Sequence, residues 1–252
     1  MRVLVPLPDT DFDTTEVAVP WRLLTDAGHD VVFATAHGEG RPACDQRLLD
    51  GVLFGRLGAE PEAKRHYAAM VADPAFDHPV AWGATEVTDI DGLLLPGGHA
   101  PGMRQYLGDP ELQRQVAAFW KLRRPVGAIC HGVLVLARSI DPDTGASVIA
   151  DRHVTCLPKY MERTAYLATA WKLGRYYRTY DAYVQDEVTA ALTDRKQFVR
   201  GPRELRERGT FADDGPAFVV DDGNLVTARW PGDAYLFSRR FRALLESPTT
   251  DA

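Results

Sequence analysis

Cysteine is scarce in this chain of 252 residues, which contains only Cys44, Cys130 and Cys156. Three cysteines cannot all pair within one chain, and none shows the Cys-x-x-Cys spacing of redox or zinc motifs. No cluster of His, Cys and acidic residues has the spacing of metal ligands. The sequence therefore predicts no disulfide framework, no metal and no other cofactor, and it favours a reducing compartment, the cytoplasm.

Long apolar runs and an excess of positive charge are also missing. No segment approaches the ~18 apolar residues of a membrane-spanning helix, and Pro6 interrupts the N-terminal apolar stretch too early for a signal peptide. Lys and Arg total 29 against 35 Asp and Glu, so the formal net charge is -6. Because nucleic-acid binding needs clustered cations, we expect a small-molecule substrate, with neither nucleic acid nor membrane as a partner.

What the sequence does contain is an ordinary globular mixture, 45% hydrophobic and 25% charged. Strand, helix and strand patterns follow one another twice, and this order makes the two strands of each unit parallel. The sequence therefore predicts a doubly wound α/β fold, a mostly parallel sheet sandwiched by helices. The units comprise strand 2–7, a helix from Thr14 or Thr15 toward Gly28 and strand 29–36, then strand 90–95, helix 110–122 and strand 125–129.

The remaining sequence contains neither repeats nor a linker, so we expect one domain, residues 1–252, with insertions at about 39–89 and 159–215. Three tyrosines in the second insertion have the i, i+4, i+7 spacing of one helical face, which predicts core or subunit interface. These tyrosines are Tyr176, Tyr180 and Tyr183.

The most informative stretch is Ala-Ile-Cys-His-Gly at residues 128–132. An apolar strand ends at Cys130, and an apolar helix follows at once, with Gly132 leaving room for a tight turn. This pattern predicts a nucleophile elbow. The positive end of the helix favours a thiolate and lowers a cysteine pKa from ~8.5 to below 7.5. We therefore expect Cys130 to be a nucleophile, with His131 as its neighbouring base.

The positions of the histidines limit which enzyme classes could supply a catalytic histidine to Cys130. After His131 the chain contains only His153, on an expected strand. Papain-like proteases, α/β-hydrolases of the dienelactone type and true class I glutamine amidotransferases all require a histidine well beyond the nucleophile. These three enzyme classes are therefore disfavoured.

Two further segments are expected near the elbow. The glycines of Pro-Gly-Gly-His, residues 96–99, follow another strand, and their backbone N–H groups could face a developing oxyanion. We assign Gly97, Gly98 and Gly132 to oxyanion or substrate binding, with Gly98 and the backbone amide of His131 as oxyanion donors and His99 lining the pocket. Glu16 lies in the first helix, at the sheet edge where open α/β sheets bind ligands. A carboxyl group beside the thiolate should have a raised pKa and should shuttle protons.

Together, residues 128–132, the Leu-Leu-Leu-Pro-Gly-Gly-His stretch at 93–99 and Glu16 resemble the DJ-1/PfpI superfamily. The resemblance implies a flavodoxin-like, class I glutamine-amidotransferase-like fold, and relatives are commonly homodimers. The insertion after residue 39 and the stretch at 157–162 resemble the heat-shock branch, which is associated with glutathione-independent glyoxalase (glyoxalase III), deglycase and chaperone activities. That branch has a Cys-His-acid triad, in which the position matching the acid is Glu162.

The leading hypothesis is a cofactor-free enzyme in which Cys130 attacks a small reactive carbonyl, such as methylglyoxal, and yields D-lactate. Two alternatives stay open. The same elbow could hydrolyse or hydrate another small electrophile, an amide, ester or isonitrile. The protein could instead be a non-catalytic holding chaperone or a redox sensor in which Cys130 is oxidised.

Overall fold

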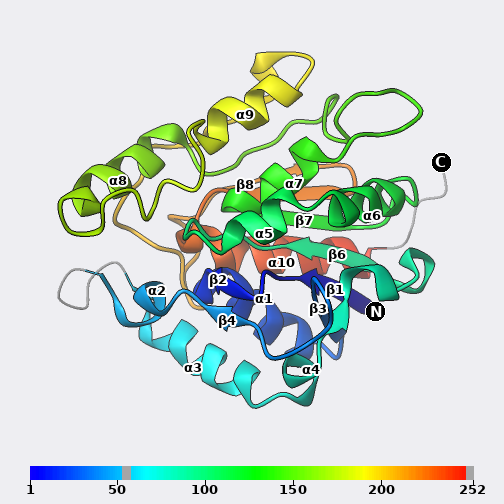
Figure 1. Ribbon diagram of the computed structural model, residues 1–252, viewed down its shortest axis with the longest axis horizontal. Helices are drawn as coiled ribbons and strands as arrows, with labels where there is room; N and C mark the ends of the chain where they lie inside the picture. Colours follow the sequence, from blue (N-terminus) through cyan, green and yellow to red (C-terminus); the bar gives the residue numbers. More distant parts are fainter. Residues whose placement is uncertain (53–57, 248–252) are drawn as a thin grey trace.

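The computed structural model describes residues 1–52 and 58–247. Its described part contains a seven-stranded sheet in the order β5-β3-β1-β6-β7-β9-β8, seen edge-on in Figure 1. All neighbouring strands run parallel except the β8–β9 hairpin. The strands are β1 (Arg2–Pro6), β3 (Asp30–Thr35), β5 (Val80–Ala81), β6 (Gly92–Leu95), β7 (Val126–Ile129), β8 (Val219–Asp222) and β9 (Leu225–Ala228).

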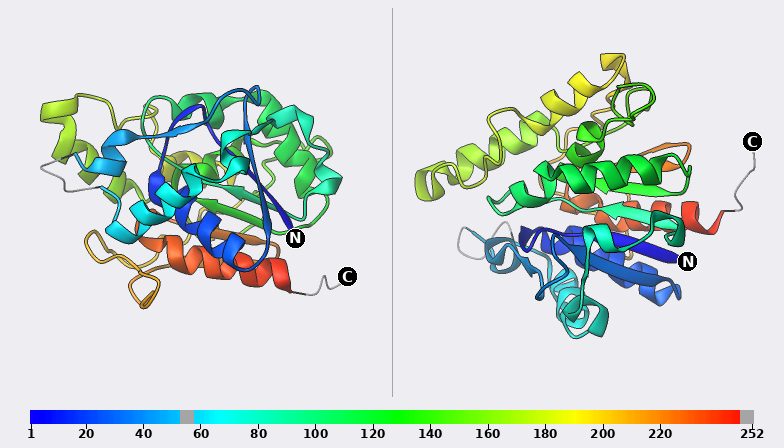
Figure 2. Two further views of the ribbon diagram at one scale, coloured as in Figure 1. Left: turned by 90° about the horizontal axis from the view of Figure 1, so that it is seen from below. Right: turned by 45° about the vertical axis from the view of Figure 1, so that its right-hand side comes forward.

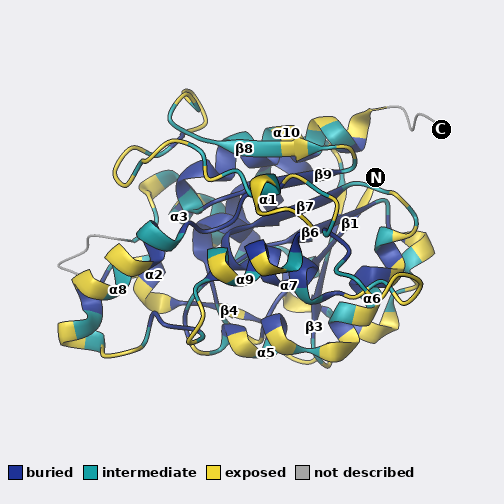
Figure 3. Cartoon of the chain, turned by 90° about the horizontal axis from the view of Figure 1, so that it is seen from above, coloured by how far each residue is buried: buried dark blue, intermediate teal, exposed yellow. Residues whose placement is uncertain are grey.

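Helices cover both faces of this sheet, as doubly wound folds require. On one face α1 (Thr14–Asp26) packs against α3 (Pro61–Val71) and α10 (Ala234–Glu246). On the other face, α5 (Met103–Gly108) and α6 (Pro110–Trp120) pack against α7 (Val133–Arg138). Helix α7 is buried along most of its length (Figure 3). The predicted α/β fold is confirmed.

The central strands lie where the sequence predicts them because they are short apolar segments bounded by turn residues. Residues 92–95 and 126–129 are fully buried, as expected of strands covered on both faces. Helix α1 begins at Thr14 because the Asp13 carboxylate accepts hydrogen bonds from the backbone N–H groups of Thr15 and Glu16. It ends two residues before Gly28, which has a positive φ of 81°.

The two expected insertions contain the remaining elements. The first adds α2 (Gln46–Asp50), α4 (Pro74–Asp77) and β4 (Ala43–Cys44), which pairs with β2 (Thr10–Phe12). Residues 53–57 of this insertion lie outside the described residues. The second adds α8 (Lys159–Leu173) and α9 (Val184–Ala191), which lie beyond α7 on the outer side of that helical layer (Figure 2).

Two predictions for local structure are wrong. Tyr176, Tyr180 and Tyr183 do not share a helical face, because they lie in the non-helical connection between α8 and α9. The expected strand at His153 is reduced to a single bridge between Val154 and Phe198. Tertiary contacts, rather than periodicity, set the path of both segments.

Strand β1 has β3 on one side and β6 on the other, so the chain reverses its direction of travel across the sheet there. Ligands of open α/β sheets bind at such a switch point, outside the carboxyl ends of the strands. Helix α1, the loop after β6 and the turn after β7 all start at this edge.

Candidate active site

Cys130 follows β7 directly and occupies the predicted elbow. Its φ is +58°, a left-handed conformation that is rare outside glycine and costs about 1–3 kcal/mol. A short 3-10 turn, Cys130–Gly132, then leads into α7. This sharp reversal holds the thiol above the end of the strand. Strain of this kind persists where the surrounding structure enforces it, often at active sites.

Gly132 allows the elbow to form. A Cβ atom at this position would lie 2.1 Å from the Leu95 carbonyl oxygen and 2.7 Å from that of Pro96. The turn after β7 therefore presses against the end of β6, and only glycine fits between them. This close packing, rather than the expected substrate contact, accounts for Gly132.

The two other glycines differ in their backbone amides. The N–H of Gly97 donates to Glu16 Oε2 at 2.9 Å, so this amide is already engaged in the structure. Gly98 has a φ of +145° and packs against the backbone of Asp11 and Asp13. The backbone amides of Gly98 and His131 are the candidate oxyanion donors; at rest the His131 amide donates to the Cys130 sulfur.

Glu16 is completely buried beside Cys130. A Cβ atom on Gly97 would approach Glu16 Oε2 to 2.6 Å and Cys130 Cβ to 2.8 Å, which places the two side chains around one point. Burial, together with the nearby Asp13 carboxylate, raises the pKa of Glu16 well above its ordinary value. Burial also raises the pKa of Asp13, to about 6. Burial therefore favours the protonated form of Glu16.

The pKa of the Cys130 thiol is raised well above its usual value, opposite to the predicted shift. Burial is the largest cause, followed by the neighbouring carboxyl groups of Glu16 and Asp13, while a hydrogen bond from the His131 backbone N–H acts in the opposite direction. Helix α7 begins three residues later, at Val133, so its positive end is too weak to reverse the effect. The resting site contains a thiol rather than a thiolate.

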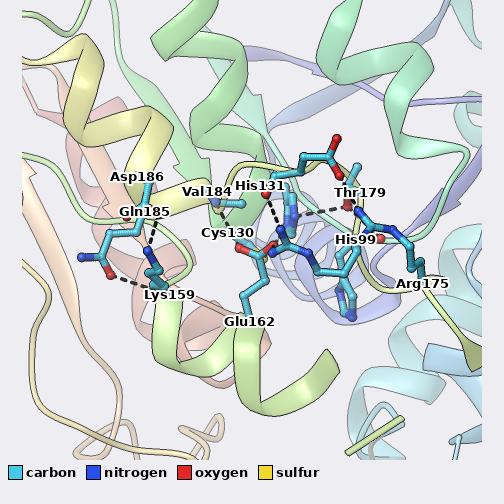
Figure 4. A network of polar contacts seen from close by, with 12 residues as sticks. His99, Cys130, His131, Lys159, Glu162, Arg175, Thr179, Val184, Gln185 and Asp186 are labelled. Carbon is cyan, nitrogen blue, oxygen red and sulfur yellow. Dashed lines mark hydrogen bonds and ion pairs between the residues drawn. The ribbon is translucent and has the colours of Figure 1, made fainter. Parts of the chain in front are cut away.

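His131 is placed to remove the thiol proton. Its Nδ1 lies 3.5 Å from Cys130 Sγ, and its Nε2 lies 3.3 Å from Thr179 Oγ1 (Figure 4). The Thr179 hydroxyl has one hydrogen, which it donates to the His99 carbonyl oxygen at 2.8 Å. Its remaining lone pairs accept from Nε2–H of His131. This contact selects the tautomer whose Nδ1 lone pair faces the sulfur.

The His131 imidazole is neutral. Burial lowers its pKa well below the ordinary value, and the neighbouring His99, Arg138 and Arg178 lower it further. A neutral imidazole can accept the thiol proton, whereas an imidazolium could not.

Glu162 has partners other than the one expected for it. Its carboxylate accepts hydrogen bonds from Arg178 Nη1 and from the backbone N–H of Val184, both at 3.0 Å. Glu162 and Val184 are labelled in Figure 4. Within the described residues, no hydrogen bond joins Glu162 to His131. The partner of His131 is Thr179, which sequence reasoning missed because it lies in an irregular segment between α8 and α9. Glu162 instead fixes that segment against α8 and borders the cavity described next.

Cys130 opens onto a cavity of about 210 Å³. His99 also lines it, as expected, and its ring lies 4.1 Å from that of Tyr177 and 5.9 Å from that of His131, measured between centroids. Burial lowers the pKa of His99 to about 4, so this ring is neutral as well. Most of the other walls are apolar and include Leu48, Leu157, Met161, Ala165, Ala168 and Trp230.

These features define a class of protein: a doubly wound α/β protein with a buried cysteine at a nucleophile elbow, beside a protonated glutamate and a neutral histidine. A family model described as ThiJ/PfpI family-like matches residues 7–202. The chain therefore belongs to the ThiJ/PfpI family.

Individual relatives agree with this assignment. An uncharacterized protein of Schizosaccharomyces pombe is 30% identical over 216 residues, which cover 81% of this chain and 78% of that protein. A protein named as a deglycase from Pyrococcus abyssi is 26% identical over 98% of this chain and 100% of its own length. The crystal structure of glyoxalase III from Candida albicans has a TM-score of 0.70 at 17% identity, with 98% of each chain covered. Similarity at that identity shows a shared fold.

The names of these relatives indicate enzymatic activity in the family. Within the described residues, no helix is both long enough and apolar enough to span a bilayer.

Proposed function

We propose that this protein is a cysteine-dependent, cofactor-free enzyme of the glyoxalase III type, which converts methylglyoxal to D-lactate. The observation that carries the proposal is the grouping of a nucleophile, a base and an acid at one strand end. Cys130 lies at the elbow with His131 Nδ1 at 3.5 Å and the protonated Glu16 beside it. The thiol also borders a cavity that can hold a small carbonyl compound.

In the first step Sγ of Cys130 bonds to the aldehyde carbon while the thiol proton moves to Nδ1 of His131. Glu16 gives its proton to the aldehyde oxygen, which yields a hemithioacetal. The backbone N–H groups of Gly98 and His131 stabilise the negative charge that develops on this oxygen. Because the thiol is protonated at rest, base catalysis by His131 generates the nucleophile during the reaction.

The second step moves hydrogen between the two adjacent carbons. The Glu16 carboxylate removes the proton on the former aldehyde carbon, and the His131 imidazolium protonates the ketone oxygen to give an enediol. Glu16 then protonates the second carbon while His131 takes the proton of the first hydroxyl group. The result is a thioester of a 2-hydroxy acid. The aldehyde carbon has been oxidised and the ketone carbon reduced, so no external redox cofactor is needed.

Hydrolysis completes the cycle. Water attacks the thioester carbon, its proton passes to Glu16, and the His131 imidazolium returns a proton to the departing sulfur. The overall reaction adds one water to methylglyoxal and releases lactic acid, with all three side chains restored. The names of the Pyrococcus abyssi and Candida albicans proteins support carbonyl chemistry of this kind.

The test is chiral detection of lactate formed from methylglyoxal by the wild type and by Cys130→Ala. We expect D-lactate from the wild type and loss of turnover in the variant. Cys44→Ala is the matched control, because Cys44 is also a buried cysteine but lies on β4 and is not among the cavity-lining residues. Equal turnover by Cys130→Ala and the wild type would exclude covalent catalysis by Cys130. Mass spectrometry with amide, ester and isonitrile substrates tests hydrolysis or hydration instead.

A further inference from the structure

The cavity beside Cys130 is larger and more apolar than methylglyoxal requires. Helix α8 presents Met161, Ala165 and Ala168 to it, at the i, i+4, i+7 spacing of one helical face. Leu157 and Trp230 also line the cavity. These apolar residues gain free energy by covering an apolar substituent. The hydroxyl groups of the cavity wall belong to Thr15, Thr164, Thr169 and Tyr177.

The size of the cavity suits a ring. An apolar cavity of roughly 150 Å³ in another protein is known to admit benzene, and the present one measures about 210 Å³. Methylglyoxal contributes only a methyl group beyond its two carbonyls, so it would leave most of this space unfilled. Unfilled apolar walls lose the dispersion contacts that a larger substituent would restore.

The charged groups at the cavity wall already have counter-charges. Glu162 pairs with Arg178 at 3.0 Å, and Arg208 lies 4.0 Å from Glu60 with its guanidinium over the Trp230 ring at 5.3 Å. Asp13, the remaining charge, caps α1 and lies within the field of Arg208. An anionic substituent entering the cavity would lose its hydration without gaining an unpaired cation, because Arg208 already pairs with Glu60.

From these walls, their size and their paired charges, we propose that the preferred substrates are α-oxoaldehydes with a neutral apolar substituent as large as a phenyl ring, such as phenylglyoxal. This inference rests on the proposed function, which it narrows to a substrate class. The oxoaldehyde group occupies the end of the cavity at Cys130, and the ring lies under α8 against Met161 and Ala165. The chemistry at Cys130 is the same, and the product from phenylglyoxal is mandelate.

The first experiment compares kcat/KM for phenylglyoxal, methylglyoxal and hydroxypyruvaldehyde, each followed by detection of its 2-hydroxy acid. One methylene in an apolar pocket is worth roughly 10- to 200-fold, so we expect phenylglyoxal to exceed methylglyoxal by at least roughly tenfold. Hydroxypyruvaldehyde should be the poorest substrate. A wild-type kcat/KM for methylglyoxal equal to or above that for phenylglyoxal would overturn the inference.

Ala165→Trp tests the position of the ring, because it fills the cavity from α8 at a half-buried site. We expect kcat/KM for phenylglyoxal to fall at least roughly tenfold more than that for methylglyoxal. The control is Leu167→Trp, which adds the same ring to α8 at a residue that is 61% exposed and not among the cavity-lining residues. An equal loss for both substrates in Ala165→Trp contradicts the proposed placement.

Binding separates failure of the substrate class from failure of the enzymatic function. Acetophenone carries the same ring but no aldehyde, so calorimetric titration detects its binding without turnover. One outcome is that the wild type binds acetophenone, Ala165→Trp does not, and no oxoaldehyde is converted by either protein. That outcome supports the apolar subsite and refutes the proposed reaction. Turnover of methylglyoxal without binding of acetophenone refutes the subsite and leaves the reaction intact.

Discussion

Replacing Thr179 with valine tests whether this hydroxyl, and not the Glu162 carboxylate, positions His131. Valine keeps most of the shape of threonine and removes two contacts, the donation to the His99 carbonyl at 2.8 Å and the acceptance from His131 Nε2 at 3.3 Å. Both ends of this link are buried, since Thr179 and His131 are each 1% exposed. No water from bulk solvent can easily replace the hydroxyl.

The expected decrease in the rate of Thr179→Val follows from the free-energy cost of a buried N–H without a hydrogen-bond partner, about 1–3 kcal/mol. That cost is greatest in the transition state, where His131 takes up the thiol proton and its Nε2–H becomes a charged donor. A transition-state loss of this size corresponds to a roughly 5- to 150-fold decrease in rate. Because Thr179 is not among the residues that line the cavity, we expect the decrease in kcat and little change in KM.

The assay is steady-state turnover of methylglyoxal by Thr179→Val and Thr179→Ser, with urea unfolding to compare their stabilities. Thr179→Ser retains the hydroxyl and should recover most of kcat, which a purely structural role of the Thr179 methyl group does not predict. Glu162→Gln is the competing variant. If Thr179→Val keeps kcat within about twofold while a folded Glu162→Gln loses it, Glu162 is the residue that positions His131 and our reasoning is refuted.

Three further predictions concern the buried charges. Glu16→Gln should retain the hydrogen bond from the Gly97 N–H but lower kcat for methylglyoxal by roughly 10²–10⁴-fold, the usual contribution of a proton-transfer residue. An unchanged kcat would show that Glu16 does not transfer a proton in the reaction. Asp13→Asn preserves the helix cap but removes a negative charge that raises the pKa of both Glu16 and Cys130, so both pKa values should fall. At a given pH near 8, iodoacetamide should then alkylate Cys130 faster in the variant than in the wild type. An unchanged or slower rate of alkylation contradicts the expected fall in the Cys130 pKa. Asp233→Ala leaves the fully buried Arg229 without its two hydrogen bonds of 2.8 Å to the Asp233 carboxylate. It should lower the free energy of unfolding, measured in urea, by about 3–5 kcal/mol, whereas Asp221→Ala, which breaks the exposed pair with Arg240, should lower it by about 0–1 kcal/mol. Similar losses for both variants would show that burial does not decide the cost.

Local patterns were sufficient to predict the elbow and the elements around it. Residues 126–129 form a strand because they are a short apolar run, and the Cys-His-Gly sequence that follows permits only a tight turn before α7. The same reasoning placed Glu16 in the first turn of a helix that starts at the carboxyl edge of the sheet. These features depend on neighbours within a few residues along the chain.

The connection between α8 and α9 could not be predicted in the same way. Residues 174–183 show neither helical nor strand periodicity in the structure, and tertiary contacts hold them: Arg178 to Glu162, and Thr179 to His99 and His131. The two contacts of Thr179 join residues 80 and 48 positions apart in the chain. A threonine in an irregular segment carries no signal of that kind, and Glu162 therefore took its place in the prediction.

The protonation state of Cys130 shows why a motif alone can predict the wrong electrostatics. A helix N-terminus stabilises a nearby negative charge by about 0.3–1 kcal/mol at a surface and up to ~2 kcal/mol when partly buried. Desolvation of a fully buried ionisable group shifts its pKa by up to 3–5 units, each worth about 1.36 kcal/mol. At Cys130, which is 3% exposed and faces two carboxyl groups, the second effect is larger. A thiol held in this way stays protonated at rest, where it resists oxidation; in the proposed mechanism it becomes nucleophilic only when His131 removes its proton.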